Sequence, residues 1–122
     1  MSTTITKTEL TEWLETFKLG WIKKKKDIVL KLFSKTEKYY ERPFKAGTTQ
    51  EEIEGYWHDI DNLDDIEFDY EIVALDGNTA CVHWDNKYCY EGSRYHLDGI
   101  YTIKFNENKE CIEFRQWWFM ET

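Results

Sequence analysis

The first half of the chain spaces its apolar residues as amphipathic helices do. The first predicted helix begins after Thr6, which has capping-box spacing with Glu9 in the first turn, and it ends near Gly20. Its apolar face consists of Leu10, Trp13, Leu14, Phe17 and Trp21. A second helix is predicted with Asp27 as its N-cap, and a third from about Thr48, where the capping-box spacing recurs. The pattern therefore predicts three helices in the first half of the chain.

The apolar residues recur at every second position after Asn62, which predicts strands. Four alternating stretches are separated by short turns such as Asp76-Gly77. The stretches are 64–75, 79–90, 94–105 and 110–120. Long strands joined by short turns form an antiparallel meander. We therefore predict a single α+β domain over residues 1–122, with the helices covering one face of a curved, mainly antiparallel sheet.

Composition and charge narrow the classes of partner. The 122 residues carry a formal net charge of −8, which argues against nucleic acid because its phosphates require clustered Lys and Arg. Aromatic residues make up 17%, a share that suits a small-molecule cavity as well as a core. Cys81, Cys89 and Cys111 lack metal-site spacing, so we expect free thiols and no metal. The chain shows no signal-peptide pattern and no long apolar run, so we expect a cytoplasmic protein that does not enter the membrane.

Four segments, taken in order, resemble the NTF2-like superfamily and in particular its SnoaL-like branch. They are DIVLKLFSKTEKYYERPF, KAGTTQEEIEGYW, DGNTACVHWDNKY and DGIYTIKFNENKECIEFRQWW. The resemblance implies a cone-shaped α+β barrel, in which three helices pack on a strongly bent sheet around an internal pocket. It also implies a homodimer through the outer face of the sheet. Members include isomerases, cyclases, dehydratases and non-catalytic ligand binders, so the resemblance does not fix a reaction.

The segment YYERP differs from the isomerase members of this superfamily. Those members place a general-base aspartate directly before the proline, where this chain has Arg42. A guanidinium does not act as a base near neutral pH, and Glu41 points to the opposite face of the strand, so it could replace the base only if the local register slips. We therefore expect both charges at the rim of the pocket, with Tyr40 lining it. At the mouth of the pocket, Arg42 would suit an anionic ligand.

The stretch RYHLDGIY contains the candidate catalytic residues. Tyr101 matches the position of the isomerases' oxyanion-stabilising acid, and its hydroxyl can donate a hydrogen bond to an oxyanion. His96 and Asp98 resemble the acid/base pair of SnoaL-type cyclases. Alternation places them opposite Tyr101, so they face the cavity only if a bulge near Gly99 intervenes. The alternative is a place on the outer face or in a dimer interface.

The remaining candidates are mostly aromatic. The resemblance implies that Arg115 and Trp117 of the last strand face the cone, where Arg115 would bind an anionic ligand or pair with an acid. Further ligand-binding candidates are Trp21, Trp57, Trp84 and Tyr88.

These observations predict a homodimer that binds a small hydrophobic or aromatic molecule without a cofactor. If it is an enzyme, a proton transfer in an isomerisation, cyclisation or dehydration fits the groups available. The alternative is a non-catalytic domain that senses a ligand or binds another protein.

Overall fold

The computed structural model describes residues 4–121. Three α-helices precede the long strands of the sheet. They are α1 (Lys7–Ile22), α2 (Lys26–Leu32) and α3 (Gln50–Tyr56). A single 3-10 turn, η1 (Ile60–Asn62), leads from α3 into the sheet. The predicted order of helices and strands is confirmed. Within the described residues, no helix is both long and apolar enough to span a membrane.

The predicted start of α1 is confirmed in detail. The Thr6 hydroxyl accepts a hydrogen bond from the Glu9 amide at 3.1 Å, and the Glu9 carboxylate accepts one from the Thr6 amide at 2.9 Å. The predicted end is wrong, because the helix runs through Gly20 to Ile22. A Cβ on Gly20 would lie 2.7 Å from the Val29 side chain. This glycine therefore allows α1 and α2 to approach closely, and it does not end the helix.

The caps of the two shorter helices differ from the predictions. Helix α2 begins at Lys26 without a side-chain cap, and Asp27 lies inside its first turn. Helix α3 is capped by Thr49, whose hydroxyl accepts a hydrogen bond from the Glu52 amide. The cap is thus one residue later than predicted, because Thr48 and Thr49 both have an acid three residues on.

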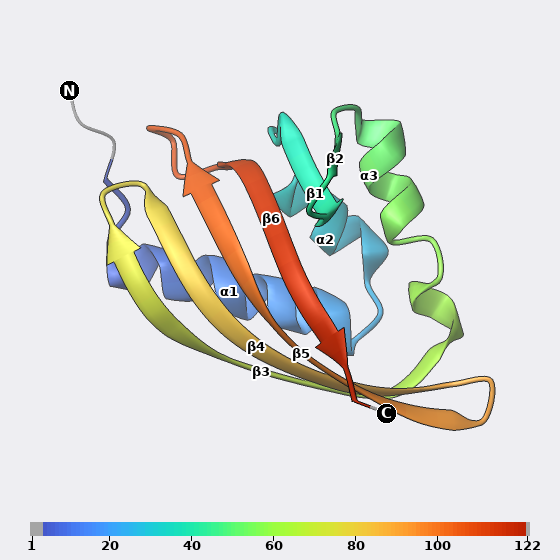
Figure 1. The fold of residues 1–122 in the computed structure, drawn as a ribbon. Helices are drawn as coiled ribbons and strands as arrows, with labels where there is room; N and C mark the ends of the chain where they lie inside the picture. The colour runs from blue at the N-terminus through green and yellow to red at the C-terminus, as the bar shows by residue number, and fades with distance from the viewer. Residues whose placement is uncertain (1–3, 122) are drawn as a thin grey trace.

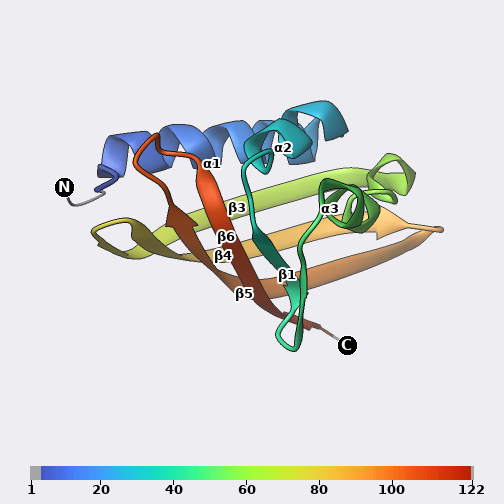
Figure 2. The same cartoon turned by 90° about the horizontal axis from the view of Figure 1, so that it is seen from above.

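The sheet has six strands in the order β2-β1-β6-β5-β4-β3. They are β1 (Lys38–Arg42), β2 (Lys45–Gly47), β3 (Leu63–Asp76), β4 (Thr79–Tyr90), β5 (Ser93–Phe105) and β6 (Cys111–Met120). All neighbours are antiparallel except β1 and β6, which are parallel. The long strands bend around α1, as Figure 1 shows, and Figure 2 shows α1 and α2 on one side of the sheet. The predicted α+β class and curved sheet are confirmed.

The core lies between the concave face of the sheet and the helices. Phe17 of α1 is 1% exposed and lies at its centre. Its ring stacks on Trp13 and meets aromatic rings from the helices and the sheet edge-on or tilted. Edge-to-face and stacked pairs of this kind fix the positions of the rings as well as burying them.

Candidate functional site

A cavity of about 450 Å³ lies beside this core and shares some of its rings, such as Trp57 and Tyr101. Its wall is formed by the last turn of α1, the end of helix α3, η1, the first residue of β3 and the strands β1, β4, β5 and β6. Ten of the eighteen lining residues are aromatic: Trp21, Trp57, Trp84, Trp118, Tyr39, Tyr56, Tyr88, Tyr90, Tyr95 and Tyr101. The volume lies within the range of small-molecule sites.

Strand alternation determines which residues reach the cavity. On β4, Trp84, Asn86, Tyr88 and Tyr90 all point inward, because residues two apart share a face. A Cβ on Gly99 of β5 would lie 2.5 Å from the Trp84 ring and 2.3 Å from the Trp117 carbonyl oxygen. Gly99 therefore allows the Trp84 indole to lie flat across the neighbouring strand.

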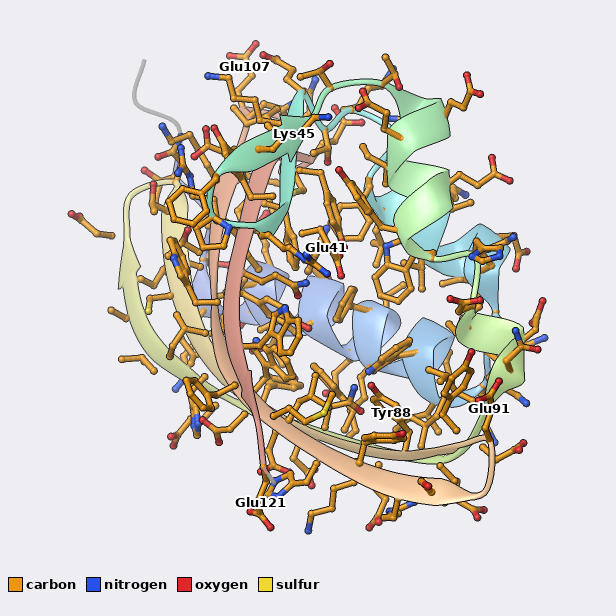
Figure 3. The ribbon with its side chains drawn as sticks, turned by 45° about the vertical axis from the view of Figure 1, so that its right-hand side comes forward. Glu41, Lys45, Tyr88, Glu91, Glu107 and Glu121 are labelled. Atoms are coloured by element: carbon orange, nitrogen blue, oxygen red, sulfur yellow. The ribbon has the colours of Figure 1, made fainter. Side chains whose placement is uncertain are left out.

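Strand β1 contributes a carboxyl group, that of Glu41, to the cavity wall. Tyr39 and Glu41 face the cavity, whereas Tyr40 and Arg42 do not line it. Figure 3 shows Glu41 and Tyr88 turned toward the space between the sheet and the helices. Burial raises the pKa of Glu41 from 4.5 to about 7, and the adjacent Arg42 opposes this only in part. Glu41 is therefore poised to gain or lose a proton near neutral pH.

The tyrosines around Glu41 are held neutral. Burial raises the pKa of Tyr39 and Tyr101 well above the usual value, and the Glu41 carboxylate raises both further. The pKa of Tyr56 and of Tyr88 is raised by the same two causes among others. A neutral phenol can donate a hydrogen bond, so these side chains can serve a ligand as donors.

Three polar groups in the described part of the wall have no hydrogen-bond partner: the indole N–H groups of Trp57 and Trp84 and the side-chain oxygen of Asn86. Trp84 and Asn86 lie two residues apart on β4, and both are 3% exposed. A buried polar atom without a partner costs about 1–3 kcal/mol. The pair offers a donor and an acceptor on one wall, which suits a ligand with polar groups of its own.

Comparisons with known proteins were made with the sequence and with the structure. No protein-family model and no curated protein matches the sequence. Among solved structures, a candidate isomerase from Bacillus subtilis superposes with a TM-score of 0.77 at 16% identity, covering 92% of this chain and 87% of that one. A protein with a ketosteroid isomerase-like fold from Catenulispora acidiphila, in complex with trimethylamine, gives 0.72 at 11% identity, covering 87% and 84%. An NTF2-like protein from Burkholderia xenovorans gives 0.66 at 13% identity, covering 93% and 92%.

The chain has the NTF2-like fold. This was predicted from the order of its sequence segments, and the structural neighbours confirm it. At these identities the likeness shows the fold alone, and the side chains in the cavity have to be considered on their own.

Five of the residues predicted as site residues line the cavity of this NTF2-like fold. They are Trp21, Trp57, Trp84, Tyr88 and Tyr101. Tyr101 is 4% exposed, and its ring stacks on that of Trp84 at a centroid distance of 5.1 Å. Their roles toward a ligand stay predictions.

The predicted acid/base pair lies on the outer face of the sheet. His96 contacts the Asp85 carboxylate at 2.6 Å and Glu121 at 3.2 Å. Asp98 lies 2.9 Å from His83. The ladder between β4 and β5 is regular along its whole length, so no bulge turns His96 or Asp98 inward. Of the two placements considered for His96 and Asp98, the structure has the one on the outer face.

The register predicted for the first and last strands is wrong. Gln116, Trp118 and Met120 line the cavity. The outer face carries Arg115, whose guanidinium lies 4.0 Å from the Tyr40 ring centroid and 3.2 Å from a Glu113 oxygen. Trp117 is 41% exposed and Phe119 is 83% exposed. Tyr40, Arg115 and Trp117 therefore do not line the cavity, because β1 pairs with β6 so that Tyr39 lies beside Phe114 of the core.

Four polar residues of the wall were not predicted as site residues: Glu41, Asp59, Asn86 and Gln116. Alternation along β4 carries a signal for Asn86, since it shares a face with Trp84 and Tyr88. Glu41 has no such signal, because β1 is too short for its inward face to be recognised from the pattern. Among the described residues, no three His, Cys, Asp or Glu side chains are placed to hold a metal ion.

Proposed function

We propose that this protein binds a small, largely apolar organic molecule in the aromatic cavity and that Glu41 exchanges a proton with it. The observation that carries the proposal is an acidic side chain with a pKa of about 7 on the wall of a cavity of about 450 Å³. General acid–base catalysis is most effective when the pKa of the group lies near the working pH. The trimethylamine bound by the Catenulispora acidiphila protein supports a small organic ligand.

The side chains around Glu41 supply the other parts of such a reaction. In the carboxylate form Glu41 accepts a proton from the ligand, and in the acid form it returns the proton to another atom. Tyr101, neutral and buried, donates a hydrogen bond to an oxygen on which negative charge develops. Trp84 and Asn86 orient the ligand through their unpartnered atoms. Isomerisation, cyclisation and dehydration all need only such proton transfers, without a cofactor.

The first experiment combines mass spectrometry with hydrogen exchange. Native mass spectrometry of freshly purified protein identifies the molecule retained in the cavity. That molecule is then incubated with protein in D₂O, and its uptake of deuterium at carbon is followed. We expect Glu41→Gln to slow the uptake by about 100-fold or more, as the loss of a general base does. Tyr101→Phe should slow it while leaving the fold intact, and Glu54→Gln, an exposed acid on α3, should have no effect.

A result of equal deuterium uptake with wild type and Glu41→Gln would contradict the catalytic part of the proposal. The second candidate, a non-catalytic ligand-sensing or interaction domain, would then be favoured. The exposed rings of Trp117 and Phe119 on the outer face support that candidate, because such rings are enriched where proteins meet.

We also propose that the outer face of the sheet pairs with a second copy of the chain. Trp117 and Phe119 lie there beside the paired charges of His83, His96 and their acids. Light scattering should give twice the mass of one chain for wild type and a smaller mass for Phe119→Arg. A monomeric wild type would contradict this. The free thiols of Cys81, Cys89 and Cys111 support the proposal of a cytoplasmic location.

A further inference from the structure

We propose that the ligand of the cavity is an organic cation, an amine or a quaternary ammonium whose charged end lies among the aromatic rings beside Glu41. This inference rests on the proposed function, since it names the class of molecule that the same cavity takes. It departs from the neutral or anionic ligands that the sequence suggested.

The first support is the chemistry of the wall. Four tryptophans and six tyrosines line the cavity, and an aromatic ring presents a negative face to a cation. The wall also contains two acidic residues, Glu41 and Asp59, and the Asp59 side chain is exposed. None of the lining residues described by the structure is a Lys, Arg or His.

The second support is the position of the positive charges. Arg115 lies on the outer face against Tyr40 and Glu113, and Arg42 is exposed at the end of β1. His58, 3.3 Å from Asp59, does not line the cavity either, so an anion inside it would meet two acidic side chains and no cationic lining residue. The formal net charge of −8 also attracts cations to the protein and repels anions.

The third support is that Glu41 has no positively charged partner among the residues that line the cavity, since the adjacent Arg42 does not line it and offsets the effect of burial on its pKa only in part. The groups that face it are Tyr39 on its own strand, Tyr56 of α3, Tyr88 of β4 and Tyr101 of β5. All four are neutral tyrosines. A buried carboxylate without a partner is unfavourable, and an ammonium group beside it removes that cost.

Cation binding and the proposed chemistry then depend on each other. Burial raises the pKa of Glu41 to about 7, and a neighbouring cation lowers it. Binding therefore releases a proton near neutral pH, and affinity rises as pH increases through about 7. The bound cation leaves Glu41 as the carboxylate, which is the form that accepts a proton.

Two probes of nearly the same shape test the charge of the ligand. Phenyltrimethylammonium and tert-butylbenzene differ in one atom, a positively charged nitrogen in place of a carbon. Their dissociation constants are measured by tryptophan fluorescence at pH 6 and pH 8 in 0.15 M salt, which screens the surface charges. We expect the cation to bind at least about tenfold more tightly than the neutral probe at pH 8. That advantage should shrink at pH 6.

The variant Glu41→Gln should lose most of this advantage and its dependence on pH. Glu54→Gln removes the same charge from an exposed position and should behave as wild type. Thermal unfolding of each variant confirms that it is folded.

The possible outcomes separate this inference from the proposed function. If tert-butylbenzene binds as tightly as the cation, the ligand class is wrong and the apolar cavity of the proposed function stands. If Glu41→Gln binds the cation as wild type does at both pH values, Glu41 is not the counter-charge and the inference fails. If neither probe binds and no molecule is retained on purification, both the inference and the proposed function fail.

Discussion

The half-buried carboxyl of Glu41 should make the protein less stable at high pH than it would be without this charge. Burial raises the pKa of Glu41 in the folded protein to about 7, from 4.5. The unfolded chain ionises this side chain near its ordinary value, so above pH 7 the folded state alone bears the cost of the buried charge. Replacing Glu41 with the neutral isostere Gln removes that cost.

The magnitude follows from the difference between the two pKa values. A difference of one pKa corresponds to about 1.4 kcal/mol, so Glu41→Gln should stabilise the fold by about 3 kcal/mol at pH 8. Below pH 4.5 the carboxyl is protonated in both states and the gain should vanish. Between pH 4.5 and pH 7 it should increase steadily. For a domain of 122 residues, about 3 kcal/mol raises the unfolding temperature by about 10 °C.

Urea denaturation of wild type and Glu41→Gln at pH 4, 5, 6, 7 and 8 measures the difference directly. Other groups that titrate affect both proteins equally and cancel in the comparison. Glu54→Gln serves as the control, because an exposed carboxyl should give a difference close to zero at every pH. A difference between Glu41→Gln and wild type that is constant with pH would refute the reasoning, since it would mean that Glu41 titrates normally in the fold.

Three other predictions concern the scaffold around the cavity. Gly99→Ala should destabilise the fold by about 3 kcal/mol or more in urea denaturation, because its Cβ would overlap the Trp84 ring and the backbone of β6. A loss of stability under about 1 kcal/mol would contradict this, since it would mean that Trp84 and β6 move aside at little cost. The hydrogen bond to Asp85 raises the pKa of His96 above 6.5, so its contribution to stability is full below pH 6.5 and is lost as pH rises through the higher folded value. An NMR titration should show this raised value in wild type and a lower one in Asp85→Asn, and equal values would exclude the pairing. Burial raises the pKa of the Cys111 thiol to about 12, so a thiol-specific disulfide reagent should modify it only after unfolding, and rapid reaction in the native protein would contradict its burial.

The three helices and the four long strands, in their order, could be predicted from the sequence alone, whereas the short strand β2 and the turn η1 could not. Caps such as Thr6 with Glu9, and turns such as Asp76-Gly77, are local: the residues that form each hydrogen bond or tight turn lie within a few positions of one another. The prediction of an inward face for Trp84 and Tyr88 likewise needed only the alternation along a strand of twelve residues.

The tertiary structure alone decided which faces of β1 and β6 line the cavity. Alternation states that Glu41 and Arg42 face opposite ways, but it does not state which of them faces inward. That choice depends on the parallel pairing of β1 with β6, where Tyr39 lies beside Phe114, a residue 75 positions away in the chain. A shift of one residue in this register would exchange every inward side chain for an outward one. Glu41 became the candidate acid/base, and Arg115 left the cavity, because burying the rings of Tyr39 and Phe114 in the core fixes that register.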